Sequence, residues 1–264
     1  MSKRLIFLLL LSFCMASGAF EIATVAPGAI ARGGIVSVGP DGTNPAAIVN
    51  DNGCFCGLNY TNLYGIKNLQ CWDADILVTA RSKNGYALRL NVLGNTVYQE
   101  KSLGFSYGRQ FSKSIAVGVT INYYDLTISG YRRTGTAGFT CGAKFFPDTT
   151  LNFTLLFENV NAPKICDGQE NLPQIFAFGW QWQALGRCEL SGEIFKDTRR
   201  PFIFRSGLRI EIVRGCDLLA GVQFNPDRFA GGFEITWRRI RFACAVQHHP
   251  ALPFTFYYGC GLNF

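Results

Sequence analysis

Short segments in which apolar and polar residues alternate follow one another along most of this chain. Residues 115–124 read IAVGVTINYY, with a β-branched or aromatic side chain at every odd position. The last twelve residues, 253–264, read PFTFYYGCGLNF, with Phe, Tyr, Cys and Leu on one parity and mainly Thr, Gly and Asn on the other. Because strand side chains alternate between two faces, each such segment is predicted to be a β-strand with one apolar face.

The alternating segments number fourteen, and each is about as long as the ~9–11 residues that a tilted strand needs to cross a membrane. Their predicted ranges are 56–66, 71–81, 85–94, 97–109, 114–129, 133–146, 149–160, 173–183, 186–197, 201–213, 216–225, 228–238, 239–249 and 253–264. The pattern predicts an all-β fold, a transmembrane antiparallel up-and-down β-barrel of about 14 strands, with apolar faces toward lipid and polar faces toward a wet lumen. A soluble secreted β protein with the faces inverted also fits the alternation, but the segment lengths and the 23 Phe residues favour the barrel.

The connections between these segments support the barrel. With a periplasmic N-terminus, the turns after even-numbered segments are expected to be periplasmic and short. They are short, as at 147–148 and 214–215. The long connection, residues 161–172, follows the seventh segment and is therefore predicted to face outward. The last segment is expected to pair with the first and to close the sheet.

The N-terminus indicates export. Lys3 and Arg4 precede the apolar run 5–11, and small residues follow at 17–19. These features predict a secretory signal peptide, residues 1–19, cleaved after Ala19, because the run is too short to span a membrane as a helix. Residues 20–54 are Gly/Pro-rich and only weakly periodic. They are predicted to form a plug in the lumen of a barrel made by 55–264, in the outer membrane of a Gram-negative bacterium.

No motif indicates an enzyme, a metal site or a cofactor. The two histidines, His248 and His249, both fall in a predicted outer turn, where a His-based triad lacks suitable placement. Cys54 and Cys56 have no recognised metal-ligand spacing. The net charge of +7 is not gathered into a Lys/Arg run, so nucleic acid is not an expected partner. Removal of Cys14 with the signal would leave nine cysteines, an odd number whose pairing the sequence does not define.

Charged residues on the inward parity are the candidate functional residues of the wall. They either pair across neighbouring strands with glutamates such as Glu193 or line a pore that selects ions or anionic groups. The predicted lumen-facing charges are Lys144, Arg205, Arg209, Glu211, Glu234, Arg238 and Arg241. On the outward parity, Trp180, Trp182 and Trp237 are predicted to anchor the barrel at the lipid headgroups.

Residues 31–47, ARGGIVSVGPDGTNPAA, resemble the N-terminal motif of the FadL/PorV-like outer-membrane proteins. The matching residues are Gly33, Gly34, Asp41, Asn44, Pro45 and Ala46. The stretch LGFSYGRQFSKSIAVGVTINYYDLTISGY, the segment LLFENVNAP and the closing stretch IRFACAVQHHPALPFTFYYGCGLNF are also similar to that family. The resemblance implies a fourteen-stranded barrel with an N-terminal plug.

The resemblance also implies two alternative functions. FadL-type members move hydrophobic small molecules across the outer membrane, whereas PorV-type and PorQ-type members serve type IX secretion of proteins. The chain is shorter than typical members and nearly lacks long outer loops. We expect a channel or transporter for small molecules, hydrophobic ones among them, gated by the plug; the alternative is a non-conducting scaffold that binds secreted proteins.

The closing aromatic residues form the last predicted site. Tyr258, Leu262 and Phe264 lie on the outward parity, and the chain ends on an aromatic side chain. Such an end looks like the signal by which the barrel-assembly machinery recognises its clients. The expected partners are therefore this machinery, outer-membrane lipid, and either small hydrophobic molecules or secreted proteins.

Overall fold

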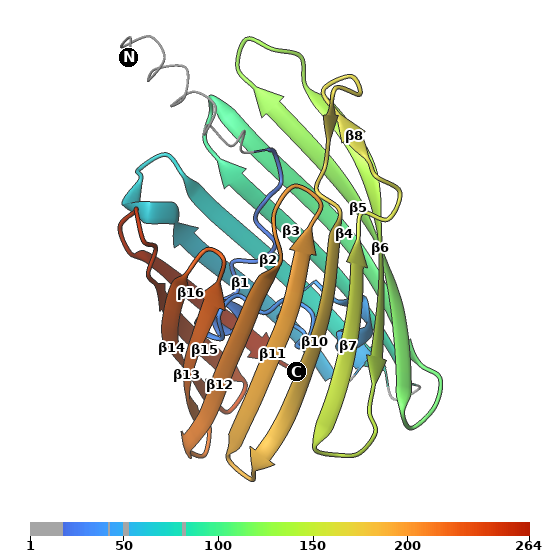
Figure 1. Cartoon of the computed structure of the whole chain (residues 1–264), viewed down its shortest axis with the longest axis vertical. Helices are drawn as coiled ribbons and strands as arrows, with labels where there is room; N and C mark the ends of the chain where they lie inside the picture. Colours follow the sequence, from blue (N-terminus) through green and yellow to red (C-terminus); the bar gives the residue numbers. More distant parts are fainter. Residues whose placement is uncertain (1–17, 42, 50–52, 81–82) are drawn as a thin grey trace, which may run out of the picture.

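The computed structural model describes residues 18–264 except 42, 50–52 and 81–82. Within them, fourteen antiparallel strands form one closed barrel in the order β1-β16-β15-β14-β13-β12-β11-β10-β7-β6-β5-β4-β3-β2 (Figure 1). The predicted fold class is confirmed. The main part of the predicted signal peptide, residues 1–17, lies outside the described residues.

The barrel strands are long, and each pairs with its neighbours in sequence apart from β7 with β10 and the closing pair. Their bounds are β1 Gly53–Asn62, β2 Gln70–Ala80, β3 Asn84–Gly94, β4 Tyr98–Gln110, β5 Ile115–Ile128, β6 Thr134–Phe145, β7 Leu151–Glu158, β10 Ile175–Leu185, β11 Cys188–Asp197, β12 Ile203–Val213, β13 Cys216–Phe224, β14 Arg228–Trp237, β15 Ile240–Gln247 and β16 Thr255–Asn263.

Short elements complete the fold. A two-stranded sheet, β8 (Lys164–Ile165) with β9 (Glu170–Asn171), forms in the long connection at one end of the barrel, and a short 3-10 turn, η2 (Leu63–Gly65), follows β1. The N-terminal segment holds the helix α2 (Pro27–Ala31) and the 3-10 helix η1 (Pro45–Val49). Among the described residues, no helix is long and apolar enough to cross a membrane.

The first and last strands close the barrel, as predicted. Their register pairs Phe55 with Asn263 and Thr61 with Tyr257. Beyond the strand itself, the backbone N–H of Phe264 donates to the carbonyl of Cys54, at 2.8 Å. The first strand begins and ends earlier than the predicted 56–66, because residues 63–65 turn into η2, where Tyr64 has a left-handed φ of 56°.

Side chains alternate between the outside of the barrel and its lumen. On β5, Ile121 is 53% exposed whereas its neighbour Thr120 is 7% exposed. On β4, Phe105 is 52% exposed, while the hydroxyl of Ser106 meets that of Thr120 on the inner side. The outer face is therefore apolar and the inner face polar, the arrangement of membrane-embedded barrels. It excludes a soluble sandwich, in which the apolar faces would point inward.

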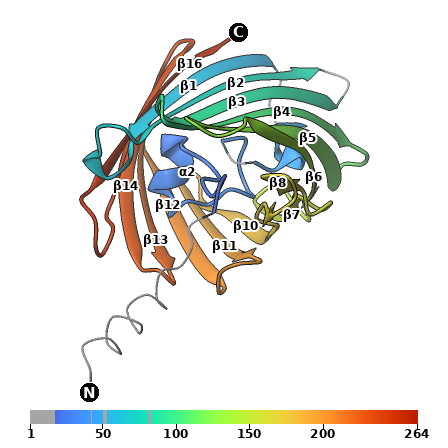
Figure 2. The same ribbon diagram turned by 90° about the horizontal axis from the view of Figure 1, so that it is seen from above.

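The N-terminal segment, described at residues 18–41 and 43–49, lies inside the ring of strands (Figure 2). The helix α2 packs against β13–β16, and η1 packs against β2–β6. Val36 and Ile30 are almost fully buried against apolar side chains of the wall. The core of the molecule is therefore the contact between this segment and the inner wall.

Candidate functional site: the N-terminal segment and the barrel lumen

The backbone of the N-terminal segment approaches the wall most closely where the wall carries glycine. A Cβ atom on Gly221 of β13 would lie 2.1 Å from the backbone nitrogen of Gly33. A Cβ on Gly118 of β5 would lie 2.5 Å from the carbonyl carbon of Pro45. Both distances are far shorter than a real carbon contact. The backbone of the segment therefore packs directly against these inward glycines, and any side chain at these positions would displace the segment.

Gly33 itself needs to be glycine. Its φ of +82° is a left-handed conformation that residues with a Cβ rarely adopt, and a Cβ there would meet the carbonyl oxygen of Val222 at 2.6 Å. Gly34 follows with a φ of +81°. These two glycines let the chain turn sharply after α2 while touching β13.

Asn44 holds the segment in two directions. Its side-chain nitrogen donates hydrogen bonds to the carbonyl oxygens of Ser37, at 2.8 Å, and of Leu155 on β7, at 3.2 Å. Its side-chain oxygen accepts the backbone N–H of Ala46, at 3.0 Å. Pro45 then begins η1, a position where its fixed φ and missing N–H cost nothing. The Asn-Pro-Ala motif therefore starts a buried helical turn and ties it to the wall.

A buried ion network joins the segment to the opposite wall. Arg241 of β15 donates to both carboxylate oxygens of Asp41, at 3.2 and 3.1 Å, and to Glu234 of β14, at 2.7 Å. Arg32 lies 3.7 Å from Asp41, and Arg209 lies 3.7 Å from Glu234. Paired and hydrogen-bonded charges are the form in which a protein interior tolerates ions.

This network keeps Asp41 ionised. Burial alone would raise the pKa of Asp41, but the guanidinium groups of Arg241 and Arg32 outweigh burial and lower the pKa from 3.8 to about 2. The carboxylate therefore carries its charge at every pH at which a cell envelope functions.

Glu193 of β11 forms a second link. One carboxylate oxygen accepts the backbone N–H groups of Val36, at 3.0 Å, and Ser37, at 2.8 Å. The other accepts a hydrogen bond from Arg205 of β12, at 2.7 Å. Glu193 is 3% exposed, so the charge is balanced inside the protein and not by water. The wall therefore supplies an acceptor for two backbone donors that the segment's irregular path leaves unpaired.

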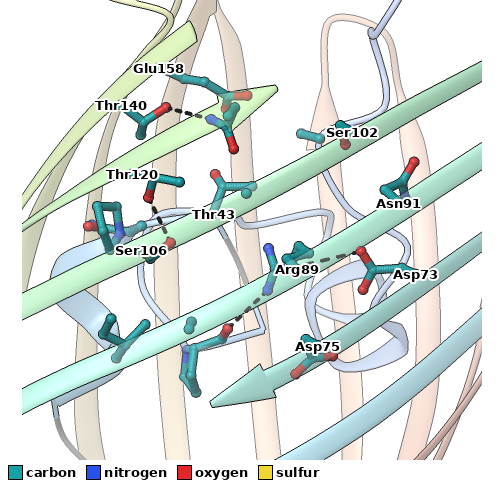
Figure 3. Close-up of a pocket in the computed structure, with 18 of the residues that line it drawn as sticks. Thr43, Asp73, Asp75, Arg89, Asn91, Ser102, Ser106, Thr120, Thr140 and Glu158 are labelled. Atoms are coloured by element: carbon teal, nitrogen blue, oxygen red, sulfur yellow. Dashed lines mark hydrogen bonds and ion pairs between the residues drawn. The ribbon is translucent and has the colours of Figure 1, made fainter. Parts of the chain in front are cut away.

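A polar cavity of about 100 Å³ lies between the segment and β2–β7 (Figure 3). On the cavity wall, the hydroxyls of Ser106 on β4 and Thr120 on β5 lie 2.8 Å apart. Arg89 donates to the carbonyl of Pro40, at 3.4 Å, and lies 3.9 Å from Asp73. Further polar side chains on the cavity wall are Asp75, Asn91, Glu100, Ser102, Asn122, Thr140 and Glu158.

A second cavity, of about 280 Å³, lies on the other side of the segment. Its lining mixes polar groups with many apolar side chains, among them Ile30, Val36, Ile175, Phe195 and Ile203. Ile22 and Ala23 line both this cavity and the polar one. The two cavities are therefore neighbours separated by the N-terminal segment.

The predicted inward charges fall in different surroundings. Arg205, Arg209, Glu234 and Arg241 lie in the ion pairs described above. Lys144 is buried, with its ammonium 5.1 Å from the ring centre of Phe146. Glu211 accepts a hydrogen bond from the N–H of Gly215 at the β12–β13 turn and lines a cavity at that end.

The prediction for Arg238 is wrong. The residue lies in the turn between β14 and β15, with a left-handed φ of 56° and an exposed side chain. Its guanidinium lies 5.4 Å from the ring centre of Trp237 and not in the lumen. The alternation of β14 ends one residue earlier, at Trp237, because the hairpin to β15 needs Arg238 in its turn.

The tryptophans and the closing aromatics lie on the outer surface. Trp182 is 44% exposed on the turn-proximal part of β10, Trp237 is 63% exposed at the end of β14, and Trp180 is half-buried over Gly192. Tyr258, Leu262 and Phe264 are all exposed on the outward face of β16 or just beyond it. Their predicted roles in anchoring and assembly stay predictions.

Sequence reasoning missed the acidic residues of the polar cavity. Asp73, Asp75 and Glu100 lie on the inward parity of β2 and β4, and Arg89 on that of β3. The sequence did carry a signal for the two aspartates, because Asp73 and Asp75 alternate with the outward residues Trp72 and Ile76. The cysteines are simpler: all nine in the described part of the chain are free thiols. No group of three or more His, Cys, Asp or Glu suited to a metal occurs in that part.

No protein-family model and no curated protein sequence matches this chain. Solved structures match it by fold. The TodX deltaS2S3 mutant, a monoaromatic hydrocarbon channel whose parent is the Pseudomonas putida toluene transporter, is similar with a TM-score of 0.72 and 9% identity, covering 93% of this chain and 100% of TodX. The CymD monoaromatic hydrocarbon channel has a TM-score of 0.66 and 11% identity, covering 93% of this chain and 99% of CymD. A Pseudomonas aeruginosa FadL homologue has a TM-score of 0.64 and 10% identity, covering 92% of this chain and 98% of the homologue. At such identities the likeness shows the fold alone, that of FadL-like barrels.

Proposed function

We propose that this chain is an outer-membrane channel whose N-terminal segment plugs the lumen and opens by moving. The proposed organisation is a signal peptide at 1–19, a plug that starts at residue 20, and a barrel that begins with β1 at Gly53, two residues before the predicted 55. The apolar exterior supports a lipid-embedded barrel, and the exposed Trp182 and Trp237 suit the headgroup region at the rim.

The observation that carries this proposal is the position of Ile22 and Ala23 between two cavities. Displacement of Ile22 and Ala23 would open a path for a solute from one cavity to the other. The contacts that oppose displacement are specific and breakable, since they run from Asp41 to Arg241 and from Glu193 to the backbone of Val36. A segment held in a closed barrel by separate ion pairs and hydrogen bonds, in addition to apolar packing, is suited to gating.

The proposed cargo is small hydrophobic molecules. The similar solved structures are named as hydrocarbon channels or a toluene transporter, and the lining of the larger cavity includes apolar side chains, among them Phe195 and Ile203, beside its polar groups. Ligand pockets typically combine such apolar walls with a few polar groups that fix orientation. We place the β8–β9 end outside the cell and the C-terminal end in the periplasm, with the outward residues Tyr258, Leu262 and Phe264 read by the barrel-assembly machinery.

Uptake of the hydrophobic dye 1-N-phenylnaphthylamine tests this function. Cells that carry the protein in their outer membrane should take up the dye faster than cells without it, and Ile203→Asn should reduce the increase. Heat-modifiable migration on SDS gels should show equal amounts of folded barrel. Equal uptake with and without the protein would contradict transport. Co-purification of secreted proteins with a barrel that does not conduct would favour the PorV/PorQ-like scaffold instead.

A further inference from the structure

A buried carboxylate stands at the start of the N-terminal segment. Glu100 of β4 is 6% exposed. One of its oxygens accepts the backbone N–H of Phe20, at 2.9 Å, and the other accepts the hydroxyl of Tyr98. Both donors are neutral.

The arginines near Glu100 are paired with other carboxylates. Among the described residues, no Lys or Arg forms an ion pair with it. The neighbouring acidic groups already have partners, since Glu21 pairs with Arg200 and Glu170 lies 3.6 Å from Arg199. A buried carboxylate without a positive partner is costly, and removing a positive group from such a site is strongly destabilising. One positively charged group beside Glu100 would therefore balance the charge of this carboxylate.

The proposed cleavage after Ala19 would create that cation in place. Hydrolysis of the Ala19–Phe20 peptide bond by a signal peptidase consumes one water. It leaves a carboxylate on Ala19 and an amino group on Phe20, and the amino group is largely protonated at neutral pH because its ordinary pKa is about 7.7–8.0. The nitrogen concerned is the one that already lies 2.9 Å from Glu100.

We propose that Glu100 binds the α-ammonium group of processed Phe20 and thereby fixes the start of the N-terminal segment in the lumen. This inference rests on cleavage after Ala19. The ring of Phe20 is placed independently, because it packs edge-on against Tyr124, with ring centres 4.9 Å apart. Signal-peptide removal then changes a neutral hydrogen bond into a buried ion pair, so the processed chain holds its segment more firmly than the precursor.

Glu170 provides the matched control. It also accepts a backbone N–H, that of Ala19, at 3.0 Å, but cleavage removes that residue. Glu100 and Glu170 are thus two carboxylates at the same end of the segment, of which only Glu100 accepts the N–H of Phe20. Substitution of Glu170 by Gln should leave the ammonium site intact.

The test is the acylation of the Phe20 amino group by an N-hydroxysuccinimide ester, followed by peptide mass spectrometry. The protein is purified from membranes in detergent. Folded wild type should react at least tenfold more slowly at pH 7 than heat-unfolded wild type. Glu100→Gln should remove most of this protection, and Glu170→Gln should keep it. If Glu100→Gln does not fold, the pH dependence of the wild-type reaction still tests the proposal.

The pH dependence of the reaction separates ion pairing from simple burial. An ion pair with Glu100 raises the pKa of the amino group, whereas burial without a partner lowers it. The groups that face this site are Glu100 and Tyr98 from β4, Tyr124 from β5, Glu170 from β9, Arg199 and Arg200 from the β11–β12 turn, and Glu21 of the segment. A raised pKa in wild type that is lost in Glu100→Gln supports the proposal. An unprotected amine, a lowered pKa, or a mature N-terminus other than Phe20 overturns it, whether or not the barrel conducts.

Discussion

Replacing Arg241 by Met should release the N-terminal segment. The substitution keeps a long side chain but leaves Asp41 and Glu234 without their shared guanidinium, and their side chains are only 16% and 3% exposed. Breaking a buried ion pair typically costs about 3–5 kcal/mol. Because Arg32 remains 3.7 Å from Asp41 and keeps part of the pairing, we expect a cost below this range, about 2–3 kcal/mol. At about 1.4 kcal/mol per factor of ten, the displaced population rises roughly 30- to 150-fold.

Trypsin cleavage after Arg32 measures that population, because Arg32 is 5% exposed and cleavage requires the segment to leave the wall. Arg238→Met is the matched control, since Arg238 lies exposed in a turn and does not touch the segment. The variant Arg241→Met should be cleaved at least thirtyfold faster than wild type, and Arg238→Met at the wild-type rate. A rate for Arg241→Met within threefold of wild type would refute the reasoning.

Three further perturbations test separate parts of the account. The folded-state pKa of Asp41 is lowered from 3.8 to about 2, so its contribution is complete above about pH 4 and is lost as the pH falls toward 2. The protection factors of segment amides, which correct hydrogen exchange for its intrinsic pH dependence, should therefore be lower at pH 2.5 than at pH 5, and Asp41→Asn should flatten this difference. Gly221→Ala should destabilise the bound position of the segment by about 1–3 kcal/mol, because the added Cβ overpacks against Gly33. Gly231→Ala is the control, since its added Cβ would meet only the Leu219 carbonyl oxygen, at 3.7 Å. Equal trypsin cleavage rates for the two variants would contradict close backbone packing of the segment on the inward glycines. Deletion of Phe264 removes the backbone bonds to Cys54 and an exposed aromatic end, so the amount of heat-modifiable barrel in membranes should fall while the conductance of each inserted barrel stays unchanged; undiminished insertion would count against an assembly signal.

The barrel could be predicted from the sequence because alternation is a local property. The predicted range 114–129 extends one residue beyond β5 at each end, and the predicted range 216–225 extends one residue beyond β13 at its C-terminal end. The errors occur where a strand boundary depends on pairing with a distant residue or on a tight turn. The start of β1 is set by pairing with Phe264, which is far away in sequence, and Arg238 belongs to a tight hairpin that parity does not reveal.

The site was predicted less completely than the wall. Asp41 and Asn44 were singled out from a family-like motif, and Arg241 as a lumen-facing charge. The contacts of Asp41 with Arg241 and of Asn44 with Leu155 were not predicted, since these partners lie 200 and 111 residues away along the chain. Glu100 was overlooked because its role depends on the position of Phe20, and no strand pattern encodes that contact. Strand alternation predicts which side chains point into the lumen. Which of those side chains contact the N-terminal segment depends on the path of that segment, which the alternation does not encode.

Conductance in planar lipid bilayers tests the central claim most directly. The claim is that residues 20–49 restrict passage through a barrel that stands without them. The full mature chain and a chain lacking residues 20–49 are compared at equal amounts of heat-modifiable barrel. The account predicts a clearly larger single-channel conductance for the shortened chain, because the two cavities then join. Equal conductance of the two chains would contradict it.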